Sequence, residues 1–346
     1  IHMFAQDSLD DADVQPSSAY CLLCHEQTTD VYTFASGETV SLKIDPTVLS
    51  HSVHGDSNSE GPLQCSDCHV DHLFPHQPIA STTKREFQLE RYAVCRTCHE
   101  DQYTKSQDSV HGEVLREGKI EAAVCVDCHG GHDVQPPDEP IQRISLTCGK
   151  CHGAIFDQYR QSIHGTVLFE EGNTDVPTCV GCHGVHDISS PETSSFRNRS
   201  PEICATCHAN DELMEKYGIS THVFDTYLSD FHGTTVALFE QTDPNAVTNK
   251  AVCYDCHGVH DIAEVNSEKS RVVRENLLET CRECHPTASS DFSDAWVGHF
   301  PPTLEDHPLL YGVNLFYDIL IPATIGAFLF LIATDIIRRI RQRLSR

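Results

Sequence analysis

The chain has 346 residues, 39% of them hydrophobic, with 18 cysteines, 23 histidines and a formal net charge of −27. This charge excludes general nucleic-acid binding, because a phosphate backbone is bound by a basic face. The hydrophobic fraction is low, so something other than aliphatic side chains is expected to fill the interior. The cysteines could form disulfides, hold metal ions or carry covalent cofactors, and their spacing distinguishes these possibilities.

Every cysteine belongs to a Cys-x-x-Cys pair followed directly by histidine. The nine motifs are Cys21/Cys24/His25, Cys65/Cys68/His69, Cys95/Cys98/His99, Cys125/Cys128/His129, Cys148/Cys151/His152, Cys179/Cys182/His183, Cys204/Cys207/His208, Cys253/Cys256/His257 and Cys281/Cys284/His285. Two thiols at this spacing reach the two vinyl groups of one porphyrin, and the next imidazole lies under its iron. Zinc and iron–sulfur sites need no histidine after each pair. The sequence therefore predicts nine covalently bound haem c groups.

The N-terminal part offers two further predictions. Residues 1–20 form an extension in which Phe4-Ala5-Gln6 could be what remains of a cleaved export signal, or the first residues could be foreign to the mature protein. Residues 31–44 alternate apolar and polar side chains around Ser36-Gly37, which favours a small β-hairpin over an irregular loop. Elsewhere we expect a mainly α fold with extensive irregular structure and little sheet.

The motifs alternate between two kinds, which divides residues 21–300 into two-haem repeats. The first kind is followed by a polar stretch ending in His-Gly and is headed by Cys21, Cys95, Cys148, Cys204 and Cys281. The second kind has another histidine three residues after the motif and is headed by Cys65, Cys125, Cys179 and Cys253. The predicted repeats are 21–94, 95–147, 148–203 and 204–280, with a half repeat at 281–300.

Each repeat supplies two histidines beyond its motifs, which are candidates for the second axial ligand of iron. The His-Gly set is His54, His111, His164 and His232; the second set is His72, His132, His186 and His260; His299 takes the His-Gly place in the half repeat. Nine candidates for nine irons predict bis-histidine ligation. The histidines expected not to bind iron are His2, His51, His76, His222 and His307.

The position of the second set restricts which iron it can serve. His132 follows His129 by three residues, which is too close to reach the opposite face of the same porphyrin. This set should therefore serve neighbouring haems, whereas the pairing of the His-Gly set stays open. Only Met3 and Met214 could supply a thioether. Because methionine ligation raises the reduction potential, low-potential haems are expected.

The C-terminal part predicts a membrane anchor. After a linker at 301–312, residues 313–337 are predicted to form one transmembrane helix, since about 20 mostly apolar residues span a bilayer. A buried amphipathic helix is the alternative, but residues 319–333 are apolar on all faces. The tail at 338–346 contains five arginines. The positive-inside rule therefore predicts a cytoplasmic C-terminus and a periplasmic haem domain at a bacterial cytoplasmic membrane.

The alternating CxxCH, SxHG and CxxCHGxHD pattern over residues 21–299 resembles the multihaem cytochrome c families of respiratory bacteria. A second resemblance, carried by GETVSLKIDPTVLSHSVHG, WVGHFPP and the terminal apolar segment, is to membrane-anchored cytochromes c paired with a b-type cytochrome. These resemblances imply a closely spaced series of haems with no substrate at iron. They also imply two kinds of partner: a membrane-embedded b-type cytochrome or other quinone-linked subunit, and periplasmic or outer-membrane electron-transfer proteins.

An electron carrier is therefore expected rather than an enzyme. One alternative is a nitrite, hydroxylamine or sulfur-compound oxidoreductase with one open haem; another is a structural haem subunit of a larger respiratory or photosynthetic complex. Enzymes of the first type often carry lysine in place of the proximal histidine. Lys150 lies between the cysteines of its motif, outside the ligand position.

Overall fold

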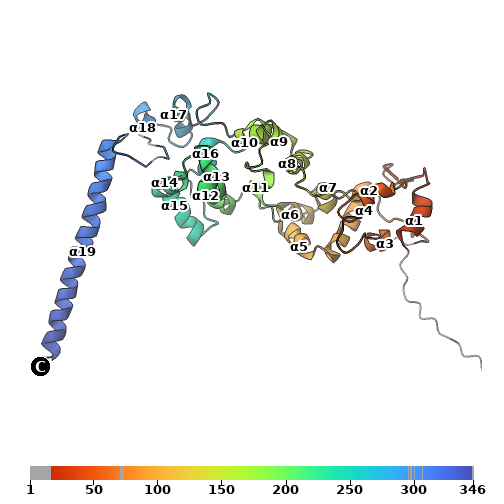
Figure 1. Ribbon diagram of the computed structural model, residues 1–346, viewed down its shortest axis with the longest axis horizontal. Helices are drawn as coiled ribbons and strands as arrows, with labels where there is room; N and C mark the ends of the chain where they lie inside the picture. Colours follow the sequence, from red (N-terminus) through yellow and green to blue (C-terminus); the bar gives the residue numbers. More distant parts are fainter. Residues whose placement is uncertain are drawn as a thin grey trace, which may run out of the picture. The chain divides into compact units, whose positions relative to one another are not determined.

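The computed structural model describes residues 17–70, 74–294, 296, 298–299, 301–305 and 307–344 (Figure 1). The chain divides into two compact units. The first unit holds Ile1–Arg197 and His257–Ser267, and the second holds Asn198–Cys256 and Glu268–Arg346. One boundary, at 197/198, lies in the third predicted repeat, and the boundaries at 256/257 and 267/268 lie in the fourth.

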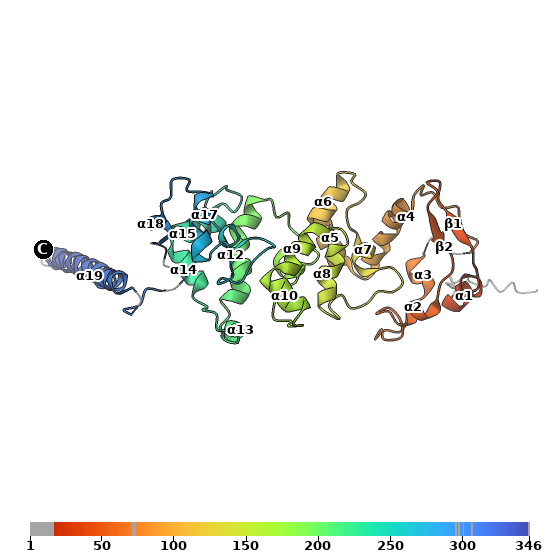
Figure 2. The same cartoon turned by 90° about the horizontal axis from the view of Figure 1, so that it is seen from above.

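The predicted β-hairpin is confirmed near the start of the first unit. Strand β1 (Val31–Thr33) pairs antiparallel with β2 (Thr39–Ser41), with Tyr32 opposite Val40. Phe34 is buried where the hairpin meets α4 (Lys84–Arg91), with its ring centroid 6.0 Å from that of Phe87. Figure 2 shows the hairpin beside this helix.

The haem-binding motifs lie on short helices of two types. Motifs of the second kind begin helices α3 (Cys65–Cys68), α7 (Cys125–His129), α11 (Cys179–His183) and α16 (Cys253–His257). Motifs of the first kind end or follow helices α1 (Ser18–His25), η1 (Tyr92–Thr97), α8 (Gln142–Gly149), α12 (Ser194–His208) and α17 (Arg274–Arg282). An aspartate inside three of the second-kind motifs caps its helix: the backbone N–H of Val124, for example, donates to Asp127 at 2.8 Å.

The His-Gly segments at His111, His164 and His232 each begin the second helix of a pair. The two helices of each pair meet at a capping residue. The helix pairs are α5 (Glu100–Asp108) with α6 (Val110–Arg116), α9 (Gly153–Gln161) with α10 (Ile163–Phe169), and α14 (Val223–Ser229) with α15 (Phe231–Thr242). In the α9–α10 pair, the Ser162 hydroxyl accepts from the N–H of Gly165 at 3.1 Å and donates to the carbonyl of Tyr159 at 2.6 Å. A Cβ on Gly165 would lie 1.9 Å from that same carbonyl oxygen. The glycine of the His-Gly motif is therefore required by close contact between helices.

The apolar core is small, as the composition predicts. Among the described residues only twelve hydrophobic side chains are buried, and Leu168, Val236 and Val252 are the largest of those that are fully enclosed. A chain of this length normally buries far more. The arrangement therefore agrees with porphyrins taking the place of an aliphatic core. The remaining short helices are α2 (Pro46–Ser50), α13 (Asp211–Glu215) and α18 (Ser290–Asp294).

The chain ends in a single long helix, α19 (Pro308–Leu344). Of the described helices, it alone is long and apolar enough to cross a membrane, and none of its most apolar part is buried in the protein. It begins inside the predicted linker, because Pro308 is suited to a first helical turn, and it continues through the arginine-rich tail. At about 1.5 Å per residue it is about 55 Å long, which exceeds the roughly 30 Å of a bilayer core.

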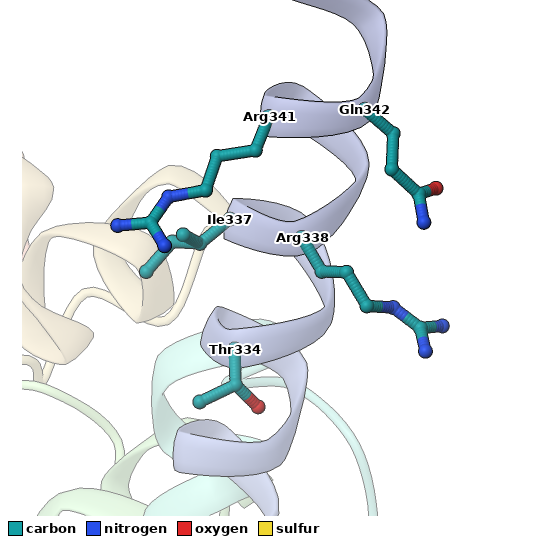
Figure 3. A pocket seen from close by; sticks show the side chains of 5 residues that line it. All are labelled: Thr334, Ile337, Arg338, Arg341 and Gln342. Atoms are coloured by element: carbon teal, nitrogen blue, oxygen red, sulfur yellow. The ribbon is translucent and has the colours of Figure 1, made fainter. Parts of the chain in front are cut away.

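The arginines lie near the end of α19. Asp335 pairs with Arg338 at 3.0 Å and with Arg339 at 2.6 Å. A shallow concavity on the same helix, shown in Figure 3, is lined by Thr334, Ile337, Arg338, Arg341 and Gln342. No cysteine or histidine lines it, so it belongs to the membrane-anchoring segment rather than to the haem-binding motifs.

Candidate haem-binding sites

Seven of the nine motif histidines face a second histidine. Their ring centroids are 5.9–6.3 Å apart. The pairs are His25–His76, His69–His132, His99–His54, His129–His186, His152–His111, His183–His260 and His285–His232.

This spacing fits one iron between each pair. A metal–imidazole bond is about 2 Å long and the ring centre lies about 1 Å beyond the nitrogen, so two axial imidazoles have centroids about 6 Å apart. Direct packing of two rings would not require a constant separation. Here the same separation recurs at seven separate places. The residues present therefore fit a haem iron ligated from both faces.

Six of the seven pairs join histidines of two different repeats. His54 of the first repeat faces His99 of the second, and His132 of the second faces His69 of the first. The same exchange joins the second and third repeats through His111–His152 and His129–His186. Within the described pairs, each His-Gly histidine faces the first motif of the next repeat, and each histidine of the second set faces the second motif of the previous one.

Backbone hydrogen bonds reinforce this exchange. The N–H of Val53, directly before His54, donates to the carbonyl of Val134 at 2.8 Å. The equivalent bonds run from Val110 to Ile188 and from Ile163 to Ile262, also at 2.8 Å. In each case the residue before a His-Gly histidine is bonded to the residue two positions after a histidine of the second set. The two exchanged histidines are therefore positioned by one shared contact.

Glycine also positions the histidines of the second set. Gly130, Gly184 and Gly258 follow their motif histidines with φ between 80° and 89°. This left-handed conformation is accessible to glycine and strained for other residues. It ends the motif helix within one residue and turns the chain so that the next histidine points away from its own motif. In the CHGxHD pattern, the glycine therefore ends the motif helix, and the histidine that follows is the candidate ligand.

The first motif has a different partner from the others. His76, which lies outside the predicted ligand set, faces His25 with ring centroids 5.9 Å apart. The Nδ1 of His25 is 2.8 Å from the carbonyl oxygen of Leu42, which leaves Nε2 for a metal. His72 lies outside the described residues. His76 belongs to no repeated motif, so the sequence pattern gave no signal for this pairing.

The two remaining motif histidines are His208 and His257, and the two remaining described candidates are His164 and His299. Burial lowers the pKa of His208 and of His299 below that of free histidine. All four belong to the ligand set proposed below.

Burial lowers the pKa of many paired histidines as well. For His54, His111, His129 and His183 the largest cause is removal of the imidazole from water, and the facing histidine adds a smaller effect of the same sign. Burial likewise lowers the pKa of His186 and His260. A lowered pKa favours the neutral imidazole, which is the form that binds a metal.

The cysteines are arranged for covalent attachment rather than for disulfides. All eighteen lie in the described residues, and none is disulfide-bonded. The first cysteines of the two motifs in each repeat lie within hydrogen-bonding distance of each other. These pairs are Cys21/Cys65, Cys95/Cys125, Cys148/Cys179 and Cys204/Cys253. Two porphyrins attached at such neighbouring sulfurs would lie side by side.

The second cysteine of each motif lies in a more open position than the first. Those that are exposed are Cys24, Cys68, Cys98, Cys128, Cys151, Cys182 and Cys284, whereas Cys207 and Cys256 are half-buried. All nine first cysteines are half-buried. The spacing places both sulfurs of a motif on one porphyrin, so a bound haem would cover the exposed ones. Haem attachment at the individual motif cysteines rests on this spacing and stays a prediction.

Comparison with known proteins agrees with this geometry. Residues 20–100 match the family model "Cytochrome c554 and c-prime", and residues 171–213 match "Doubled CXXCH motif". The cytochrome c-type protein NapC of Escherichia coli K12 is 24% identical over 151 residues, covering 34% of this chain and 68% of that protein. The cytochrome c-type protein NrfB of Escherichia coli O6:H1 is 23% identical over 207 residues, covering 57% of this chain and 80% of that protein.

The motifs, the facing histidines and these similarities all lead to one class of protein. The CxxCH motifs support haem c binding, and the apolar helix α19 is long enough to anchor the chain in a membrane. The chain is therefore a membrane-associated multihaem c-type cytochrome.

Proposed function

We propose that the protein is a nine-haem electron carrier anchored in the bacterial cytoplasmic membrane. It would pass electrons between a membrane quinone or b-type cytochrome module and periplasmic or extracellular carriers. The observation that supports this proposal most is the recurrence of facing histidines at 5.9–6.3 Å. A histidine on each face closes both axial positions of an iron, which disfavours binding of a substrate there.

The cysteines and the histidines of the chain would have different roles in electron transfer. Bound haem supplies a one-electron Fe(III)/Fe(II) couple. The motif cysteines would hold each porphyrin, and the paired histidines would hold its iron in both oxidation states. The exchange of ligands between repeats holds neighbouring porphyrins close, and we propose the same role for His164, His208, His257 and His299.

The membrane orientation is part of the proposal. Arginines at the end of α19 would remain in the cytoplasm, with the haem-binding repeats in the periplasm. This orientation agrees with the chemistry of haem attachment, which takes place outside the cytoplasm. The quinone-linked partner would contact the chain at or near the membrane.

Two measurements test this proposal. The intact mass of the purified protein should exceed the polypeptide mass by nine haem groups, and fewer would contradict the count. Electron paramagnetic resonance of the oxidised protein should show low-spin ferric signals alone, unchanged by cyanide or nitrite. A high-spin signal that responds to either ligand would instead support an oxidoreductase with one open haem.

A further inference from the structure

The first motif in the sequence, Cys21/Cys24/His25, differs from the inner motifs in the source of its facing histidine. In the inner repeats, histidines of the preceding repeat face the first motif, as His54 faces His99. His25 instead faces His76 of its own repeat. In the described residues this motif therefore takes no facing histidine from another repeat.

Leu23 distinguishes the first motif from the others of its kind. It lies between the two cysteines, directly before Cys24, and 71% of its surface is exposed. The corresponding residues of the other first-kind motifs are Thr97, Lys150, Thr206 and Glu283. All four are polar and exposed. Leu23 is therefore an apolar surface residue at a position that is polar in the other first-kind motifs.

Tyr20 extends this apolar surface. It precedes Leu23 by three residues on α1, so the two side chains lie on the same side of the helix, and 51% of Tyr20 is exposed. Helix α1 is held firmly: the N–H of Ser18 donates to Gln64 at 2.8 Å, and the Ser18 hydroxyl accepts from the N–H of Cys65 at 3.0 Å. The surface formed by Tyr20 and Leu23, the α1 patch, is thus presented on a fixed element.

The surrounding charge is strongly one-sided. Residues 17–80 contain eight aspartates and glutamates, and Lys43 is their single lysine or arginine. Residues 81–300 contain 35 acidic residues and 18 basic ones, so the imbalance is much greater in the first segment. An apolar centre within an acidic region complements a protein whose own apolar contact is surrounded by lysines.

We propose that the α1 patch is the docking surface for a soluble electron-transfer protein with a basic rim around its redox centre. This inference deepens the proposed function by assigning the soluble partner to the first motif. One electron would pass between the chain and this partner, so that the donor is oxidised by one electron and the acceptor is reduced by one. No proton moves and no bond forms or breaks.

The test measures binding of a basic monohaem cytochrome c to the full-length haem-loaded protein in detergent, by surface plasmon resonance. The variant Leu23→Thr places at position 23 the residue found in the third and seventh motifs. We expect its Kd to be about ten-fold weaker, because a buried aliphatic contact is lost. Affinity should also fall steeply with salt concentration, and an acidic flavodoxin should not bind.

The matched control is Thr97→Ser at the corresponding position of the third motif, which should change the Kd by no more than about two-fold. Haem content and the low-spin spectrum must be those of the parent protein in both variants. Equal Kd values for the Leu23→Thr variant and the parent would overturn the proposal, as would binding that does not depend on salt. Loss of haem or of the low-spin signal in the unmodified protein would instead contradict the proposed function, so the two failures are distinguishable.

Discussion

In the first repeat, His25 faces a histidine of its own repeat, whereas the other six described pairs join histidines of two repeats. The two arrangements give the same ring separation, so the geometry required at iron is constant while its source varies. An inner repeat depends on both neighbours for its ligands. The first repeat depends on one neighbour and on a local substitute, His76.

The largest effect is expected from removing an exchanged ligand. His132→Ala lies in the second repeat but should open the iron of the first repeat that His69 binds, because the two histidines face each other at 6.0 Å. One low-spin signal should become high-spin, and one equivalent of cyanide should bind per chain. His76→Ala should do the same at the first motif.

The control for these ligand variants is His51→Ala, since His51 is exposed and outside the ligand set. It should leave the spectrum unchanged. An unaltered low-spin spectrum in the His132→Ala variant would show that ligands are not exchanged between the first and second repeats.

The next effect concerns the close contact within a His-Gly segment. In Gly165→Ala, the added methyl group would meet the carbonyl oxygen of Tyr159 at 1.9 Å, so α9 and α10 must separate. We expect a loss of about 2–4 kcal/mol in the free energy of unfolding. Denaturant titration measures it, with Gly153→Ala as control. A Cβ there meets nothing within 4 Å, so that variant should be as stable as the parent or slightly more stable.

A smaller effect is expected from the capping hydroxyl. Ser162→Ala removes the acceptor for the N–H of Gly165 and the donor to Tyr159, which should cost about 1–2 kcal/mol. Thr235→Ala is the control. Its hydroxyl is exposed and donates to Phe231 within one helix, so a change below about 0.5 kcal/mol is expected. Equal losses of stability in the two variants would show that the Ser162 hydroxyl does not stabilise the junction between α9 and α10.

The smallest effect is expected at Tyr159, whose hydroxyl donates to the carbonyl of Pro177 at 2.6 Å. Tyr159→Phe should cost about 1 kcal/mol at neutral pH. Burial raises the pKa of Tyr159 to about 12. The folded state therefore holds this proton more tightly than the unfolded state, and the stabilisation is complete below about pH 10 and lost as the pH rises towards 12.

That pH dependence can be measured by comparing the unfolding of both proteins between pH 9 and pH 12, roughly the range that spans the two pKa values. The difference in stability between parent and Tyr159→Phe should shrink across this range. A constant difference would mean that Tyr159 does not titrate as a buried phenol.

Local patterns predicted local structure well. The alternation in residues 31–44 predicted the hairpin, because strand pairing across a short turn depends on neighbouring residues alone. The apolar run after residue 308 likewise predicted α19. The mainly helical fold with little sheet is confirmed, and the motif spacing correctly predicted haem c binding.

Pairing between distant histidines was not predictable from spacing. The position of His132 excluded its own iron but did not identify His69, because that choice depends on how two repeats pack. The backbone bond from Val53 to Val134 carries no sequence signal, since any residue supplies an N–H and a carbonyl. His76 shows the same limit, because it belongs to no repeated motif. The assignment of all nine distal ligands stays a prediction.

Reciprocal donation between neighbours has a consequence for how such a chain can change in length. A whole repeat inserted between two others would receive one histidine ligand from each neighbour and supply one to each. Every iron would then still have two histidine ligands. Gain or loss of half a repeat would leave one iron without a histidine from a neighbouring repeat. Another histidine near the new boundary would then have to bind that iron. His76 opposite His25 is such a ligand, because it comes from the same repeat as the motif that it faces.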